Sequence, residues 1–236
     1  MSAHPHHLRA GLHRLFALTG IAPLGAFLVI HTALNASALW GTGTLRETAD
    51  QLRRIPGLRM IEALFVFAPL VAHGGMGLWL ILTSTSLAMP RPYSRTMRVA
   101  VRASGVAAVA FIGMHLWEVR FHGPGAPLGG DVITTVLAAD LSATSHGVPW
   151  RGAVYLVGTA CVAFHFASGL WGRLAVRSDG VTTGRRLTAI AAGSVGAVLW
   201  LTLLLVVLFH ATGVRPFGGS ADEDGNAAES CPVPSR

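Results

Sequence analysis

The stretch Ala163–Trp171 reads Ala-Phe-His-Phe-Ala-Ser-Gly-Leu-Trp and lies inside a long apolar run. Its histidine, His165, stands between two phenylalanines, at a depth where an ionisable side chain is costly and usually functional. Three other apolar runs each carry one deep histidine, namely His31, His73 and His115. Two bis-histidine haems would require four such imidazoles, one axial ligand on either side of each iron. The chain is therefore interpreted as a bundle organised around these four histidines.

The composition predicts a membrane protein. Of the 236 residues, 52% are hydrophobic and only 12% are charged, whereas soluble domains contain about 25% charged residues. The formal net charge of +7 does not indicate nucleic-acid binding, because the arginines fall in short loops between apolar runs. Cys161 and Cys231 show neither a disulfide framework nor metal-ligand spacing. We expect an all-α fold in contact with membrane lipid, and no nucleic-acid partner.

Five apolar runs are long enough to cross a bilayer. We expect a cytoplasmic arm at residues 1–14, a membrane domain at 15–210 and an acidic, disordered tail at 211–236. Short helices are possible at Gly41–Arg59, along the membrane surface, and at Asp131–Ala139. The predicted transmembrane helices are Leu15–Leu39, Met60–Leu87, Val99–Phe121, Arg151–Leu174 and Leu187–His210.

The arginines predict the orientation, because short cytoplasmic loops are enriched in basic residues. If the N-terminus is cytoplasmic, ten arginines lie on that side with Asp179 as the sole acid. The other eight arginines lie on the outer side together with ten acidic residues. We expect a multi-pass protein of the inner (cytoplasmic) membrane, with its N-terminus inside and its C-terminus outside.

The depths of the histidines predict how they pair. At about 1.5 Å of rise per residue, His165 lies roughly 21 Å beyond Arg151 and close to the cytoplasmic end of its helix. By the same measure His115 lies roughly 7–8 Å from the outer boundary, and His31 is also in the outer half. His73 is near mid-depth. By elimination, His31 pairs with His115 in an outer site, and His73 pairs with His165 in an inner site.

Neighbouring residues follow the same pairing. His73 and His165 are each followed four residues later by glycine, at Gly77 and Gly169, which leaves room for a flat macrocycle on the same helix face. The outer histidines are each preceded four residues earlier by phenylalanine, at Phe27 and Phe111. His210 and Trp171 are interpreted as interfacial residues at helix ends. The predicted helix Leu187–His210 carries none of the four ligands. It is expected to pack closely through its small residues, Ala191, Ala192, Gly193, Gly196 and Ala197.

These motifs resemble the five-helix, dihaem cytochrome b subunits of bacterial succinate dehydrogenases and fumarate reductases. The resemblance covers about Arg14–Leu208. The residues that carry it are Gly20-Ile-Ala-Pro-Leu-Gly25, Ile30-His31-Thr-Ala-Leu-Asn35, Glu62, Ala68-Pro-Leu-Val-Ala-His73, His115-Leu-Trp-Glu-Val-Arg120 and His165-Phe-Ala-Ser-Gly-Leu-Trp171. In this family the corresponding histidines bind two haem b groups, in the pairing that the depths predict.

The resemblance implies a role as a membrane anchor. A flavoprotein subunit and an iron–sulfur subunit would dock on the cytoplasmic face, and electrons would pass through the haems to or from a membrane quinone, here menaquinone. Succinate chemistry would take place on the partner subunits, so no catalytic residue is expected on this chain. Some family members carry an acidic residue two positions before the histidine that corresponds to His165, as part of a proton route. Ala163 stands there in this sequence, which puts that route in doubt.

Asn35, Glu62 and Glu118 are the candidate quinone contacts. Carboxylates at the membrane edge can exchange the protons that quinone reduction requires, although each residue could instead serve a helix-end hydrogen bond or an ion pair. Two other functions remain open. One is the dihaem anchor of a hydrogenase or formate dehydrogenase, and the other is a haem-free transporter with a histidine path.

Overall fold

The computed structural model describes residues 16–83, 93–121, 139, 141–144, 149–177 and 182–214. Within these residues the secondary structure is helical and no strand occurs. Five of the described helices are long and apolar enough to cross a membrane, which confirms the predicted all-α, five-helix fold. The predicted arm at 1–14, nearly all of the tail at 211–236 and the possible helix Asp131–Ala139, except Ala139 itself, lie outside the described residues.

The first span, Phe16–Trp40, contains α2 (Pro23–Ala36) and a closing 3-10 turn, η1 (Ser37–Trp40). Pro23 opens α2, where a missing backbone donor costs little because the first N–H groups of a helix have no intrahelical partner. Gly41 then adopts φ 139°, and α3 (Thr42–Arg53) follows. A short helix therefore does occupy the polar connection Gly41–Arg59.

The second span, Leu58–Leu82, combines α4 (Leu58–Glu62), a π-helical turn η2 (Ala63–Phe67) and α5 (Ala68–Leu82). Pro69 lies in the first turn of α5 and cannot donate a backbone hydrogen bond to the preceding turn. The wide turn η2 stands directly before this proline, which is how a continuous span accommodates it. None of the residues in the apolar window of this span is buried.

The remaining spans are α6 (Arg95–Leu116) with the π-helical turn η3 (Trp117–Phe121), then α8 (Trp150–Arg177) and α9 (Thr182–Thr212). Ser94 caps α6, since its hydroxyl accepts a hydrogen bond from the Met97 amide at 3.1 Å. Helix α9 begins five residues before the predicted start at Leu187. The loop arginines Arg185 and Arg186 are therefore helical.

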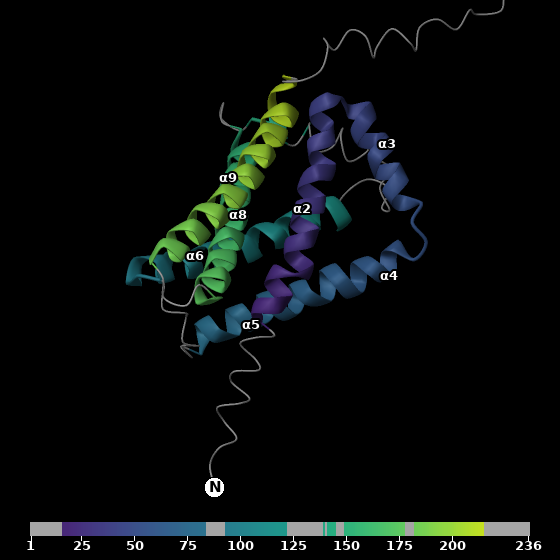
Figure 1. Cartoon of the computed structure of the whole chain (residues 1–236). Helices are drawn as coiled ribbons and strands as arrows, with labels where there is room; N and C mark the ends of the chain where they lie inside the picture. Colours follow the sequence, from purple (N-terminus) through teal and green to yellow (C-terminus); the bar gives the residue numbers. More distant parts are fainter. Residues whose placement is uncertain are drawn as a thin grey trace, which may run out of the picture.

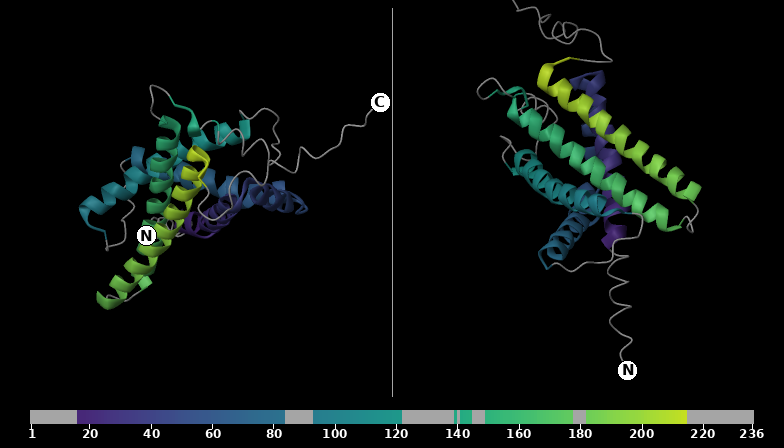
Figure 2. Two further views of the ribbon diagram at one scale, coloured as in Figure 1. Left: turned by 90° about the horizontal axis from the view of Figure 1, so that it is seen from above. Right: turned by 90° about the vertical axis from the view of Figure 1, so that its left-hand side faces the viewer.

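Helices α6, α8 and α9 lie side by side with α8 in the middle, while α2 and the α4–α5 span cross them (Figures 1 and 2). The α8–α9 contact depends on Gly196, where a Cβ would lie 2.6 Å from the Cβ of Ala167. Ala192 is also buried, but Ala191, Gly193 and Ala197 are exposed. Helix α9 therefore packs through two of the five small residues that were expected to allow close approach, because only one of its faces meets α8.

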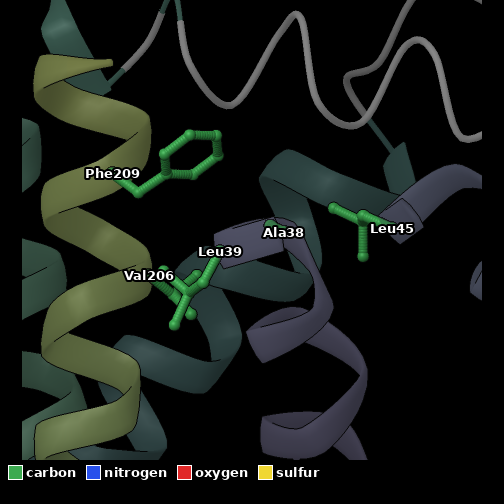
Figure 3. Close-up of a cluster of buried hydrophobic side chains, with 5 residues drawn as sticks. All are labelled: Ala38, Leu39, Leu45, Val206 and Phe209. Atoms are coloured by element: carbon green, nitrogen blue, oxygen red, sulfur yellow. The ribbon is translucent and has the colours of Figure 1, made fainter. Parts of the chain in front are cut away.

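One end of the bundle is closed by a cluster of buried apolar side chains. Val206 and Phe209 of α9 meet Ala38 and Leu39 of η1, and Leu45 of α3 completes the cluster (Figure 3). The turn η1 and helix α3 therefore cover the C-terminal end of α9. This arrangement fixes the end of the first span against the last.

Candidate functional site

The four deep histidines lie in two pairs. His31 of α2 and His115 of α6 have ring centres 5.9 Å apart, with their planes at 74°. His73 of α5 and His165 of α8 have ring centres 6.3 Å apart, with their planes at 73°. The structure therefore brings together the residues that the depth estimate pairs. Both pairs join helices that are not neighbours in the chain.

The spacing within each pair suits one metal ion between two imidazoles. A ring centre lies about 1.1 Å from a ring nitrogen and a metal–nitrogen bond is about 2.0–2.1 Å, so axial rings on one metal have centres about 6.3 Å apart. The two observed separations, 5.9 and 6.3 Å, match this value. A direct hydrogen bond between two imidazoles would place the rings closer than such a bridging ion allows.

The inner pair is oriented by backbone carbonyls. His73 Nδ1 lies 3.0 Å from the carbonyl oxygen of Phe16, and His165 Nδ1 lies 3.1 Å from that of Val101. A carbonyl can only accept, so Nδ1 carries the proton and donates, which leaves the Nε2 lone pair available for iron. Ser104 adds a hydroxyl 3.4 Å from His165 Nδ1.

Two glycines allow the inner histidines to approach the neighbouring helices this closely. A Cβ on Gly20 would lie 2.5 Å from His73 Cε1, and a Cβ on Gly105 would lie 2.8 Å from His165 Cε1. Each glycine lies four residues after the residue whose carbonyl accepts the hydrogen bond from the histidine. Carbonyl and glycine therefore share one helix face. A Cβ at Gly169, in contrast, would meet no heavy atom within 4 Å. Gly169 is exposed, so the predicted room for a macrocycle beside it stays a prediction.

His115 of the outer pair is held by side chains. His115 Nδ1 lies 3.2 Å from the hydroxyl of Tyr155, and that hydroxyl donates to Glu118 Oε2 at 2.9 Å. Arg151 approaches the other carboxylate oxygen at 3.3 Å. Because the tyrosine hydroxyl donates to Glu118, its oxygen accepts from His115, which again leaves Nε2 free. Phe111 stacks on His115 with ring centres 6.0 Å apart.

His31 differs from the other three histidines. The amide Nδ2 of Asn35 lies 3.3 Å from His31 Nε2 and donates to the His31 carbonyl at 2.8 Å. Binding of iron through Nε2 requires the Asn35 amide to turn from the ring. The bond to the backbone carbonyl can stay. Phe27 stacks on His31 at 5.2 Å, as Phe111 does on His115.

The two pairs lie at different levels of the bundle. Tyr155, which contacts the outer pair, precedes His165 of the inner pair by ten residues in α8, or about 15 Å along the helix axis. On α6, Val101 contacts His165 and precedes His115 by fourteen residues, or about 21 Å. The two predicted sites are therefore separated along both helices, and which of them is the inner one stays a prediction.

Tyr93 fixes the connection into α6 near the inner pair. Its hydroxyl donates to the Ser168 carbonyl of α8, and its ring meets Trp171 edge-on at 5.1 Å. Burial raises the pKa of the Tyr93 phenol, because the anion would be poorly solvated there. Trp171 is therefore a packing partner of Tyr93, and its expected role as an interfacial anchor stays a prediction. Its indole Nε1 is buried without a hydrogen-bond acceptor among the described residues.

His210 lies near the C-terminal end of α9, as expected, but it is not exposed there. Only 5% of His210 is exposed, its Nδ1 donates to the Val206 carbonyl at 2.9 Å, and its Nε2 is buried with no partner in the described part of the chain. The physical reason is tertiary, since η1 and α3 cover the neighbouring Val206 and Phe209. His210 has no histidine opposite it among the ring contacts of the described residues.

The candidate quinone contacts Asn35 and Glu118 are both engaged in side-chain hydrogen bonds. Asn35 is engaged with His31, and Glu118 with Tyr155 and Arg151. Glu118 thus forms an ion pair, with Arg151 of α8. Glu62 ends α4, directly before the π-helical turn η2, and is partly buried. Two of the three residues therefore adjoin the outer histidine pair.

Tyr155 is the site residue that the sequence reasoning missed. It is 6% exposed and lies four residues after Arg151 on α8. A tyrosine inside an apolar helix needs a partner for its hydroxyl, and that requirement was the available signal.

The chain is similar to the succinate dehydrogenase cytochrome b558 subunit of Bacillus subtilis (strain 168), with 29% identity over 203 residues. The similarity covers 86% of this chain and 92% of that protein. No family model matches the chain. No solved structure matches it significantly.

Proposed function

Because the chain belongs to the family of succinate dehydrogenase cytochrome b membrane anchors, we propose that it binds two haem b groups and links the iron–sulfur subunit of that enzyme to membrane quinone. The observation that carries this proposal is the pairing of four deep histidines at separations of 5.9 and 6.3 Å. Hydrogen bonds that leave Nε2 available at three of the four histidines support it.

His73 and His165 would hold the inner haem, and His31 and His115 the outer haem. When bound, each haem iron supplies one-electron exchange between its ferric and ferrous states. The chain orients the ligands through the Phe16 and Val101 carbonyls and the Tyr155 hydroxyl. Arg14, Arg98 and Arg102 are the candidate partners for the inner propionates. Arg98 already donates to the Tyr93 carbonyl at 2.8 Å, and Arg14 lies outside the described residues.

The cytoplasmic face is the proposed docking surface for the iron–sulfur subunit, with the flavoprotein subunit bound beyond it. This face consists of the arm at residues 1–14, Pro90–Arg98 and Ala175–Arg186, of which only 93–98, 175–177 and 182–186 are described. Its excess of arginine over acid would attract a partner of complementary charge. The proposed location is the inner membrane with the N-terminus cytoplasmic. Cross-links confined to the opposite loops would contradict this orientation.

Purification of the complex through a tag on this chain tests the function. We expect a flavoprotein and an iron–sulfur protein to co-purify, and succinate to produce b-type α-bands in a reduced-minus-oxidised spectrum. A nickel or molybdenum enzyme in the preparation would indicate the hydrogenase or formate dehydrogenase alternative. A spectrum without a b-type band would favour the haem-free transporter and reject the proposal.

The quinone, proposed to be menaquinone, would react near the outer pair, close to Asn35, Glu62 and Glu118. We expect the triple alanine variant to lose quinone reductase activity while succinate still reduces an artificial acceptor on the partner subunits. Carboxylates at this level can supply the protons of quinone reduction. Unchanged turnover with menaquinone analogues and unchanged inhibitor binding would place the quinone site elsewhere. Alanine at Glu47 and Asp50 of α3 provides a control for the loss of surface carboxylates.

A further inference from the structure

The inner and outer histidine pairs are held by different kinds of hydrogen-bond acceptor. Both inner histidines donate to neutral backbone carbonyls, those of Phe16 and Val101. His115 donates instead to the Tyr155 hydroxyl, which in turn donates to the Glu118 carboxylate. Among the described residues, this path links a paired histidine, His115, to an acidic side chain, Glu118.

The local geometry makes this path well defined. His115 and Glu118 lie three residues apart and thus on one face of the α6–η3 helix, which directs both side chains toward α8. Tyr155 of α8 is 6% exposed and stands between them, with its ring edge-on to His115 at 5.8 Å. Arg151, one turn earlier on α8, holds the outer oxygen of Glu118 at 3.3 Å. Both helices therefore contribute two side chains to the path.

Each hydrogen bond in this path affects the next one, from Glu118 through Tyr155 to His115. A carboxylate that accepts a hydrogen bond from the tyrosine hydroxyl makes the phenol oxygen a stronger acceptor, and hydrogen bonds in a chain strengthen one another. A stronger acceptor at Nδ1 gives the imidazole more anionic character and makes Nε2 a better donor to iron. Electron donation by an axial ligand favours the ferric over the ferrous state, and such hydrogen bonds are among the means by which proteins set haem potential.

We propose that Tyr155 is a positioning residue of the outer haem, which fixes the His115 tautomer and transmits the charge of Glu118 to that ligand. The inference rests on the proposed haem function. It assigns to the outer site a control of its midpoint potential that the inner site does not share. At the inner site the main acceptors are the neutral backbone carbonyls of Phe16 and Val101, which carry no charge to the ligands.

Redox titration of the purified complex tests the proposal with Tyr155→Phe. We expect the midpoint potential of the outer b component to rise, because His115 loses its acceptor, while the inner component keeps its value. The expected change is on the order of tenfold in the reduction equilibrium, which corresponds to about 59 mV for one electron. Glu118→Gln keeps the tyrosine hydroxyl bonded but removes the charge, so its shift should have the same sign and a smaller size.

Ser104→Ala provides the matched control, because the Ser104 hydroxyl also contacts a paired histidine yet leaves His165 bonded to the Val101 carbonyl. This variant should shift neither component. The proposal is overturned if Tyr155→Phe and Glu118→Gln leave the outer potential unchanged, or move both components equally. If the Tyr155 variant does not assemble, the Glu118 variant alone decides by the same criteria. Absence of two b components from the unsubstituted complex would instead reject the haem function itself.

Discussion

Substitution of either member of a histidine pair by alanine should remove the same b-type spectral component. We expect His73→Ala and His165→Ala to eliminate the inner component, and His31→Ala and His115→Ala to eliminate the outer one. The reason is that each iron would need both axial imidazoles for a six-coordinate, low-spin state, and among the described residues neither pair makes a ring contact with a further histidine. Low-temperature reduced-minus-oxidised spectra of the four purified variants provide the measurement.

His210→Ala is the matched control for this set. It removes a fifth membrane-helix histidine, which is 5% exposed and whose Nδ1 is bonded to the Val206 carbonyl. Both components should persist in this variant. Loss of one common component from His31→Ala and His165→Ala would show that the pairing is wrong.

The second large effect is expected at the glycines beneath the inner histidines. Gly20→Ala and Gly105→Ala place a methyl group 2.5 Å from His73 Cε1 and 2.8 Å from His165 Cε1, closer than real side chains approach. Each imidazole must move, and relief of such overpacking typically costs about 1–3 kcal/mol. Since the movement also breaks the bond to the Phe16 or Val101 carbonyl, we expect the inner component to be lost and the outer one retained.

Gly193→Ala gives the control for the glycine series. Gly193 also lies in a membrane helix, but a Cβ there meets no heavy atom within 4 Å. This variant should retain both components and, because alanine favours helix by about 1 kcal/mol over glycine, should be no less stable to heating. Equal spectra from Gly20→Ala, Gly105→Ala and Gly193→Ala would show that Gly20 and Gly105 are not needed to position the inner histidines.

The pairing of the histidines was predictable because it depends on a property of every α-helix. A rise of about 1.5 Å per residue converts sequence position into depth, and depth alone separates His165 from His115. The five spans were predictable for a similar reason, since about 20 apolar residues are needed to cross a bilayer. Neither argument requires knowledge of how the helices cross.

The hydrogen-bond partners were not predictable, because they depend on the crossing itself. Nothing in the sequence near Phe16 or Val101 shows that these carbonyls meet histidines 57 and 64 residues away. Gly20 and Gly105 looked like ordinary membrane-helix glycines for the same reason. The π-helical turn η2 and the burial of His210 likewise follow from tertiary packing, which the local pattern does not encode.

The α4–α5 span suggests that the cofactors also serve as part of the fold. No residue in its apolar window is buried, whereas α8 and α9 are packed against each other through Gly196 and Ala167. Protein packing alone therefore holds this span weakly, and a ligand shared by His73 and His165 would contribute its binding free energy to the native state only. On this basis biogenesis would be ordered in time. If haem binds as proposed, the α6–α8–α9 layer would consolidate first and haem delivery would then fix the α4–α5 span. Haem-starved cells should therefore degrade the chain from that span.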